Sequence, residues 1–155
     1  MINQMKKLIV LVNIMMIIST LHAQQTDPVH WHFSNKKIND NTYELHFTAN
    51  IDTQWHIYAQ DNPEDLGLPT TISFNNNSQT DLVGKIKEVG SLIEKKGDSG
   101  LVVKYYSNKI DFVQMLNVKT NEKLIISGVV KFMACTDTHC LPEAQRRFSI
   151  VINEH

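Results

Sequence analysis

The sequence has almost no charge imbalance and no cluster of basic residues. Its 155 residues include 16 acidic and 15 basic side chains, which leaves a formal net charge of −1. Proteins that bind nucleic acids usually carry a basic patch or stripe on one face. Because neither the balance nor the spacing of the charges provides one, we expect no nucleic-acid partner.

The sequence also lacks the short motifs that identify many enzymes. It contains no Gly-x-Ser-x-Gly motif, no phosphate-binding loop, and no spaced carboxylate pair that stands out from the surface charge. We therefore expect any chemistry to depend on other residues and to need no cofactor.

Only one apolar run is long enough to concern a membrane, and it lies at the start. Two lysines precede a nearly continuous apolar stretch from Leu8 to Leu21, and the small residue Ala23 follows at a plausible cleavage point. This layout is typical of a secretory signal peptide. A bilayer span needs about 20 residues, so an uncleaved anchor is the weaker alternative. We expect a signal peptide over residues 1–23 and a periplasmic domain over 24–155, without stable membrane insertion after cleavage. No cysteine lies near this cleavage point, so lipid attachment there is excluded.

Convincing helical periodicity is absent over more than a turn or two, and Pro63–Leu68 is the one candidate for a single turn. Apolar and polar residues alternate instead, which is typical of half-buried strands. Asn, Asp, Gly and Pro separate the alternating segments, because these residues tolerate the backbone angles of turns. Several short strands at such spacing predict an all-β sandwich or barrel. The expected strands are Val29–Phe33, Tyr43–Ala49, Trp55–Ala59, Thr70–Phe74, Leu82–Val89, Leu101–Tyr106, Ile110–Phe112, Leu124–Phe132 and Phe148–Ile152.

The chain has only two cysteines, Cys135 and Cys140. In an exported protein two cysteines usually form a disulfide. Closing a six-residue loop stabilises a fold by only about 2 kcal/mol, against about 4 kcal/mol for a staple that spans about sixty residues. The pair follows directly on the strand that ends near Phe132, which places it at the rim of a sheet. A short loop at a rim suits a bond that opens, but spacing alone leaves a redox site and a local staple equally open.

Two neighbours of the cysteines are candidates for tuning their reactivity. An imidazolium at His139 would favour the thiolate of the adjacent Cys140, whereas Asp137 would act in the opposite direction. A metal carrier is a rival interpretation, because Cys135, His139 and Cys140 could supply three ligands. None of the spacings matches a zinc or haem signature, so we expect no metal site.

Two segments together resemble a known family. They are Phe132–Glu143, followed by a strand from Phe148, and Trp55–Tyr58, followed by Leu68–Phe74. Their order and spacing resemble the amino-terminal periplasmic domain of the thiol:disulfide interchange protein DsbD, over roughly residues 29–153.

The resemblance implies an immunoglobulin-like β-sandwich with a redox-active cysteine pair. The pair would take electrons from a membrane thiol-disulfide transporter and pass them to periplasmic thioredoxin-like proteins. It also implies that Cys140 forms the mixed disulfide with partners and that Cys135 resolves it.

The sequence departs from the best-known members of this family at several positions. Four residues instead of five separate the cysteines, and Glu143 replaces a second proline. Those members shield the disulfide with a phenylalanine on a cap loop, whereas the matching region Lys95–Val103 has none. Leu101 is its nearest apolar candidate, so we expect a leaky cap. The membrane and thioredoxin-like domains are also missing, so we expect a stand-alone copy whose electron donor is a separate chain.

The sequence therefore predicts a periplasmic thiol-disulfide carrier. A non-catalytic immunoglobulin-like binding module with a local structural disulfide, and a metal carrier, are the alternatives.

Overall fold

The computed structural model describes residues 27–96 and 100–153, so the predicted signal peptide over residues 1–23 lies outside the described part of the chain. The elements in chain order are β1 (Val29–Asn39), β2 (Thr42–Ile51), β3 (His56–Tyr58), the 3-10 helix η2 (Glu64–Leu66), β4 (Thr71–Phe74), β5 (Thr80–Gly90), β6 (Ile93–Lys96), β7 (Val102–Ser107), β8 (Lys109–Val118), β9 (Leu124–Phe132), β10 (Ala134–Cys135) and β11 (Ala144–Ile152). In the described residues no helix is long and apolar enough to cross a membrane.

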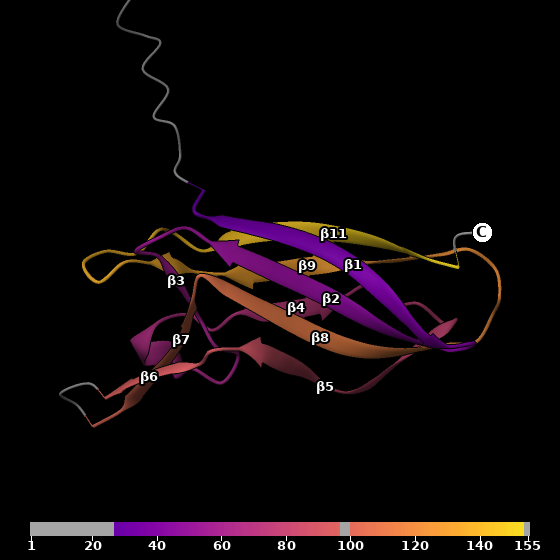
Figure 1. Cartoon of the computed structure of the whole chain (residues 1–155), viewed down its shortest axis with the longest axis horizontal. Coiled ribbons are helices and arrows are strands. Elements are labelled where there is room, and N and C mark those ends of the chain that lie inside the picture. The colour runs from indigo at the N-terminus through magenta and orange to yellow at the C-terminus, as the bar shows by residue number, and fades with distance from the viewer. Residues whose placement is uncertain (1–26, 97–99, 154–155) are drawn as a thin grey trace, which may run out of the picture.

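Two antiparallel sheets pack face to face, in the strand orders β1-β2-β8-β5 and β11-β9-β4. A third sheet, in the order β10-β3-β7-β6, lies at one end of this sandwich, on the left in Figure 1. The predicted all-β, immunoglobulin-like β-sandwich is confirmed. The single turn expected within Pro63–Leu68 is also present, as η2.

The core lies between the two large sheets and follows the alternation in the sequence. In β2, Leu45 and Phe47 are fully buried, while the residues between them are only partly covered. Phe47 meets Phe148 of β11 with ring centroids 4.8 Å apart. Gly128 of β9 allows this packing, because a Cβ there would lie 2.0 Å from the carbonyl oxygen of Ser73 and 2.5 Å from the Phe148 ring.

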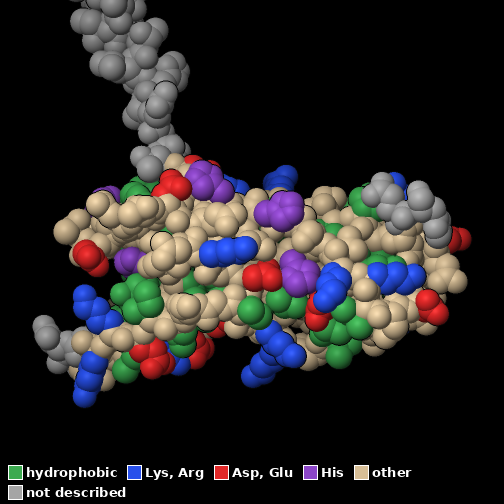
Figure 2. Space-filling model, viewed as in Figure 1, with side chains coloured by type: hydrophobic (Ala, Val, Ile, Leu, Met, Phe, Trp, Pro, Cys, Tyr) green, Lys and Arg blue, Asp and Glu red, His purple; other side chains and the backbone are tan. Residues whose placement is uncertain are grey.

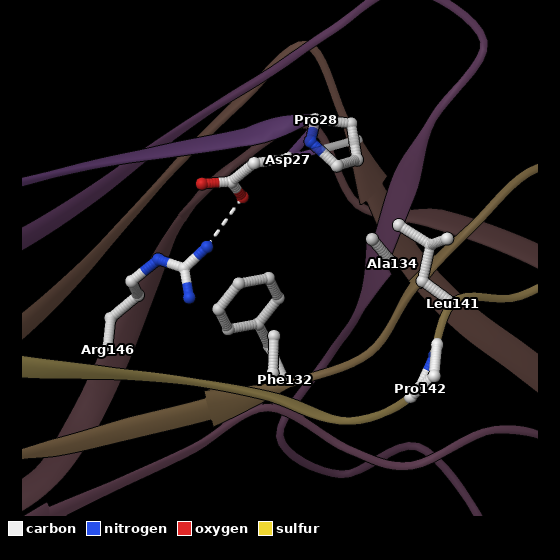
Figure 3. A pocket seen from close by; sticks show the side chains of 8 residues that line it. Asp27, Pro28, Phe132, Ala134, Leu141, Pro142 and Arg146 are labelled. Atoms are coloured by element: carbon white, nitrogen blue, oxygen red, sulfur yellow. Dashed lines mark ion pairs between the residues drawn. The ribbon is translucent and has the colours of Figure 1, made fainter. Parts of the chain in front are cut away.

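The two large sheets are tied together along the edge formed by β1 and β11. Asn35 donates a side-chain hydrogen bond to the carbonyl oxygen of Val151 at 2.8 Å. Near the start of β1, Asp27 forms an ion pair with Arg146 of β11 at 2.6 Å (Figure 3). These contacts fix β11, and with it the segment that carries the cysteines, against the start of β1.

The outer face of the first sheet carries charged side chains beside exposed apolar ones, such as Val83 and Val89 of β5. His46 lies between Asp111, at 2.7 Å, and Glu44, at 3.6 Å. On the face shown in Figure 2, acidic and basic side chains are interspersed rather than gathered by sign. This arrangement suits a sheet face that meets water.

Candidate functional site

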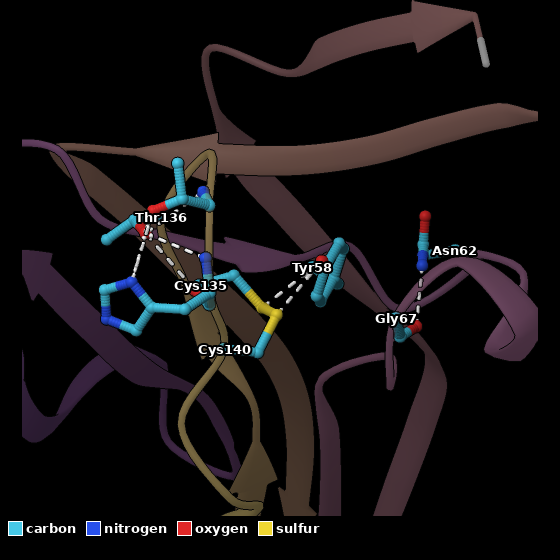
Figure 4. The surroundings of a disulfide bond; sticks show 8 residues. Tyr58, Asn62, Gly67, Cys135, Thr136 and Cys140 are labelled. Atoms are coloured by element: carbon cyan, nitrogen blue, oxygen red, sulfur yellow. Dashed lines mark hydrogen bonds between the residues drawn. A yellow bond between two sulfur atoms is a disulfide. The ribbon is translucent and has the colours of Figure 1, made fainter.

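The two cysteines lie where the chain changes sheets. After β9 ends at Phe132, β10 leaves the β11-β9-β4 sheet and pairs with β3, so that Cys135 stands opposite His56. Cys140 returns beside Cys135 as an antiparallel bridge, and a disulfide joins the two residues (Figure 4). The bond therefore sits at the free edge of the small sheet, as the sequence predicts for the rim.

The turn between the cysteines is held by hydrogen bonds of its own. The amide of Thr136 donates to the carbonyl oxygen of His139 at 2.8 Å, and the amide of Leu141 donates to that of Ala134 at 2.9 Å. The hydroxyl oxygen of Thr136 also accepts hydrogen bonds from the amides of Thr138 and His139. Because these bonds already define the turn, it does not depend on the disulfide alone for its shape.

The two sulfur-bearing residues differ in their exposure to solvent. Cys135 is 1% exposed and belongs to the buried part of the sheet, whereas Cys140 is exposed. A thiol that arrives from solvent therefore meets Cys140 first. Disulfide exchange requires attack on one sulfur while the other leaves, so the unequal exposure of the two residues favours attack at Cys140.

The hydroxyl of Tyr58 lies against the disulfide. It donates a hydrogen bond to Sγ of Cys135 at 3.3 Å and lies 3.9 Å from Sγ of Cys140. Burial raises the pKa of this phenol above its usual value of 10.0, so the hydroxyl keeps its proton at neutral pH and remains a donor. When Cys135 becomes a thiolate, this donor can stabilise the charge.

The loop that follows β3 fixes the position of Tyr58. The hydroxyl of Thr70 donates to the carbonyl oxygen of Tyr58 at 2.7 Å. Gly67 lies against the phenol ring, and a Cβ at this position would stand 2.2 Å from Cζ of Tyr58 (Figure 4). Asn62 donates to the carbonyl oxygen of Gly67 at 2.7 Å and accepts from the amide of Lys104 at 2.9 Å, which anchors the loop to β7.

The two predicted tuning residues lie in the exposed turn. His139 shares a hydrogen bond at 2.9 Å with the hydroxyl of Thr136, and its ring meets the Trp55 ring edge-on at 5.2 Å. Asp137 is exposed and acts on His56 through its charge. The roles of both residues in tuning Cys140 stay predictions.

His56 also belongs to the site, although the sequence indicates it only as one residue of the expected strand Trp55–Ala59. It stands opposite Cys135, and its ring packs against Tyr105 and Tyr58. Burial lowers the pKa of His56 below 6.5; the charge of Asp137 opposes this shift and that of Lys95 adds to it. The imidazole is therefore mostly neutral at pH 7 and adds no full positive charge beside the disulfide.

The expected cap residue, Leu101, is exposed and precedes β7. The register aligns Cys135 with His56 and His56 with Ser107. Leu101 is six residues before Ser107, a separation of about 20 Å along an extended strand. A cap formed by Leu101 therefore stays a prediction, and it requires the β6–β7 hairpin to bend towards Cys140.

Within residues 27–96 and 100–153, no three His, Cys, Asp or Glu side chains are placed to hold a metal ion. Together, the fold and the site define an immunoglobulin-like β-sandwich with an asymmetrically exposed disulfide at its rim.

No family model matches the chain, and no curated protein matches it in sequence. Solved structures do share its fold. The N-terminal domain of DsbD from Neisseria meningitidis, in the reduced form, matches with a TM-score of 0.53 and 13% identity, over 82% of this chain and 87% of that one. The N-terminal periplasmic domain of ScsB from Proteus mirabilis matches with a TM-score of 0.51 and 14% identity, over 83% of this chain and 49% of that one.

A complex between the DsbD and PilB N-terminal domains from Neisseria meningitidis also matches, with a TM-score of 0.49 and 11% identity, over 81% of this chain and 87% of that one. At these identities the likeness is one of fold. The resemblance to the DsbD amino-terminal domain seen in the sequence is confirmed at the level of the fold by the first two structures.

Proposed function

We propose that this protein is a periplasmic thiol-disulfide carrier that works through Cys135 and Cys140. The observation that carries the proposal is the unequal exposure of the two sulfur-bearing residues, with Cys140 open to solvent and Cys135 buried. The similarity in fold to the DsbD and ScsB domains supports it.

In the reduced protein, the thiolate of Cys140 attacks a client disulfide. One client sulfur leaves as a thiolate, and the other forms a mixed disulfide with Cys140. Cys135 then loses its proton and attacks Sγ of Cys140, which forms the internal disulfide and releases the client as a dithiol. Two electrons pass to the client, and the protein ends oxidised.

Reloading follows the same path in reverse. A thiolate of the electron donor attacks Sγ of Cys140, and the sulfur of Cys135 leaves with the negative charge. A thiolate in a buried position is costly unless it is hydrogen-bonded. The hydroxyl of Tyr58 is placed to provide that hydrogen bond.

The geometry weighs against a purely structural role for the bond. The turn is already closed by backbone hydrogen bonds and by the hydroxyl of Thr136. A disulfide across so short a loop adds only about 2 kcal/mol by the chain-entropy estimate. A site that exposes one sulfur-bearing residue to attack suits exchange better than stapling.

The partners and the location belong to the same proposal. The electron donor is a membrane thiol-disulfide transporter, and the acceptors are periplasmic thioredoxin-like proteins. Residues 1–23 serve as the export signal. No cofactor takes part, because exchange between thiols and disulfides needs none.

A trapping experiment tests the proposal. The Cys135→Ser variant, which keeps the Cys140 thiol but cannot resolve, is mixed with a thioredoxin-like protein whose second active-site cysteine is replaced by serine and whose first is activated as a mixed disulfide with thionitrobenzoate. The Cys140 thiolate should displace thionitrobenzoate and accumulate as a mixed disulfide between the two proteins. The Cys140→Ser variant is the matched control and should trap little, because Cys135 is buried. Trapping by Cys140→Ser alone would reverse the two roles, and trapping by neither variant would contradict the carrier.

A further inference from the structure

A cavity of about 280 Å³ lies beside the cysteine turn and has no part in the exchange chemistry (Figure 3). Six of the eight residues that line it are apolar, namely Pro28, Phe132, Ala134, Leu141, Pro142 and Ala144, and the other two are Asp27 and Arg146. The ion pair between Asp27 and Arg146 closes one side, and the Arg146 guanidinium lies 5.7 Å from the centroid of the Phe132 ring. The two charges are paired with each other, which leaves the apolar part of the lining as the surface that can take an uncharged group.

The cavity is directly connected to the reactive pair. Two of its wall residues, Ala134 and Leu141, are the sequence neighbours of Cys135 and Cys140. Successive side chains on a strand point to opposite faces. The sulfurs therefore meet Tyr58 on one face of the small sheet, and the cavity opens on the other face.

The segment 140–142 forms the free edge between these two faces. Cys135 and Cys140 form the bridge, while the hydrogen bonds on either side of it join Thr136 to His139 and Leu141 to Ala134. In this antiparallel pattern the amide and carbonyl of Cys140 point away from β10, towards solvent. An extended segment of another protein can pair with them by strand addition.

We propose that this cavity binds an apolar side chain of the redox partner, carried by the residue next to the partner's reactive cysteine. The proposal rests on the exchange role of Cys140. In a mixed disulfide the two Cα atoms lie about 4.4–6.8 Å apart, and each neighbouring residue is about 3.8 Å further along its chain. When the partner's cysteine faces Cys140, its neighbour faces the opposite side by the same alternation, next to Leu141 and the cavity.

The size and chemistry of the cavity select its occupant. Its volume lies just under the range of about 300–1,000 Å³ that is typical of small-molecule pockets, which suits one side chain of the size of leucine or phenylalanine. Phe132 and Ala134 are 2% and 3% exposed and form the covered floor of the cavity, so an occupant would contact mainly the more exposed Leu141, Pro142 and Ala144 around it. Glycine leaves the cavity empty, and aspartate would meet an arginine that is already neutralised.

The test uses peptides as probes, because the partner is not identified. The peptides are acetyl-Gly-Cys-X-Gly-amide and acetyl-Gly-X-Cys-Gly-amide, where X is Leu, Phe, Gly or Asp. In the Cys135→Ser variant, Cys140 is first joined to glutathione as a mixed disulfide. The equilibrium constant is then measured for the exchange in which the peptide thiol replaces glutathione on Cys140. In at least one series Leu or Phe should exceed Gly by about tenfold, which corresponds to about 1.4 kcal/mol.

Matched variants distinguish binding in the cavity from nonspecific apolar contact. Ala144→Phe fills the cavity and should bring the ratio of Leu to Gly, measured within that variant, close to one. Gln145→Phe places the same ring on the exposed neighbouring position, on the other face of β11, and should keep the preference. Equal constants for all four peptides in both series, or a preference that survives Ala144→Phe, would overturn the proposal. The peptides are also tested on a protein that begins at Asp27. If only this shortened protein prefers Leu or Phe, the residues before Asp27 normally occupy the cavity, and the proposal is overturned.

The outcome does not depend on the carrier function. An exposed thiol at Cys140 forms mixed disulfides whether or not the native pair cycles, so failure of the carrier leaves the peptide ratios readable. A second measurement avoids the serine variant altogether. Reduced wild-type protein should reduce the symmetric disulfide of the Leu peptide about tenfold faster than that of the Gly peptide, and equal rates would contradict the cavity's role.

Discussion

The hydroxyl of Tyr58 lies 3.3 Å from Sγ of the buried Cys135 and donates a hydrogen bond to it. Cys135 is the sulfur that must leave when a thiol attacks the exposed Cys140. The negative charge of the reaction therefore develops beside a phenol whose raised pKa keeps it protonated. Four predictions about individual residues and one about the pair itself test this arrangement.

Removal of the Tyr58 hydroxyl should slow reduction of the disulfide. A hydrogen bond to a charged group contributes about 1.5–3 kcal/mol, and a sulfur acceptor belongs at the low end of that range. We expect Tyr58→Phe to reduce the rate constant for reaction with dithiothreitol by about tenfold. Tyr105→Phe is the matched control on the adjacent strand, since Tyr105 contacts His56 rather than the sulfurs. Equal rates in the wild type and Tyr58→Phe would remove the phenol from the mechanism.

A methyl group at Gly67 should displace the Tyr58 ring and so disturb the same site. Gly67 has φ of 134°, and its Cβ would meet the Tyr58 ring, whereas Gly84 has φ of 71° with no atom within 4 Å of a Cβ. We expect Gly67→Ala to lower the free energy of unfolding by more than about 1 kcal/mol and to slow reduction as Tyr58→Phe does. Gly84→Ala should affect stability alone. The comparison fails if both alanine variants reduce at the wild-type rate.

The strands differ in how well the sequence alone could predict them. Alternation located β9 with its observed bounds, because every second residue from Ile126 to Phe132 is buried. It missed β6, whose four residues are all exposed, and β10, which has only two residues, both buried. Neither strand has a period-two pattern to detect.

The candidate site follows the same division. The cysteine pair was visible because its two residues are only five apart in the sequence. Tyr58 was noticed only as part of a family-like segment, because 77 residues separate it from Cys135. No local pattern could show that a phenol lies against the sulfurs.

The stability of the protein should depend on the protonation of His56. Its pKa in the folded state is lowered by burial, so the unfolded chain binds the proton more readily. The stabilising contribution is complete above about pH 6.5, and it is lost as the pH falls from there towards the lowered pKa of the folded state. Urea unfolding should show that the free energy of unfolding falls less between pH 7.5 and pH 5.5 in His56→Gln than in the wild type. Identical losses would contradict this role for His56.

The Leu101 cap can be tested by changing the size of its side chain. If the β6–β7 hairpin bends over the disulfide, Leu101→Gly should react faster with dithiothreitol than the wild type. Leu101→Phe should react more slowly, because a larger side chain covers more of Cys140. Three equal rates would mean that Leu101 does not cover Cys140.

The reduction potential of the Cys135–Cys140 pair tests the central claim most directly. The protein is equilibrated with glutathione or thioredoxin redox mixtures, and free thiols are counted at each ratio. Structural disulfides in exported proteins lie below about −300 mV, beyond the reach of the glutathione pool. A carrier requires a value above that limit, which is the result we predict. A potential below it would make the bond a local staple and contradict the exchange function.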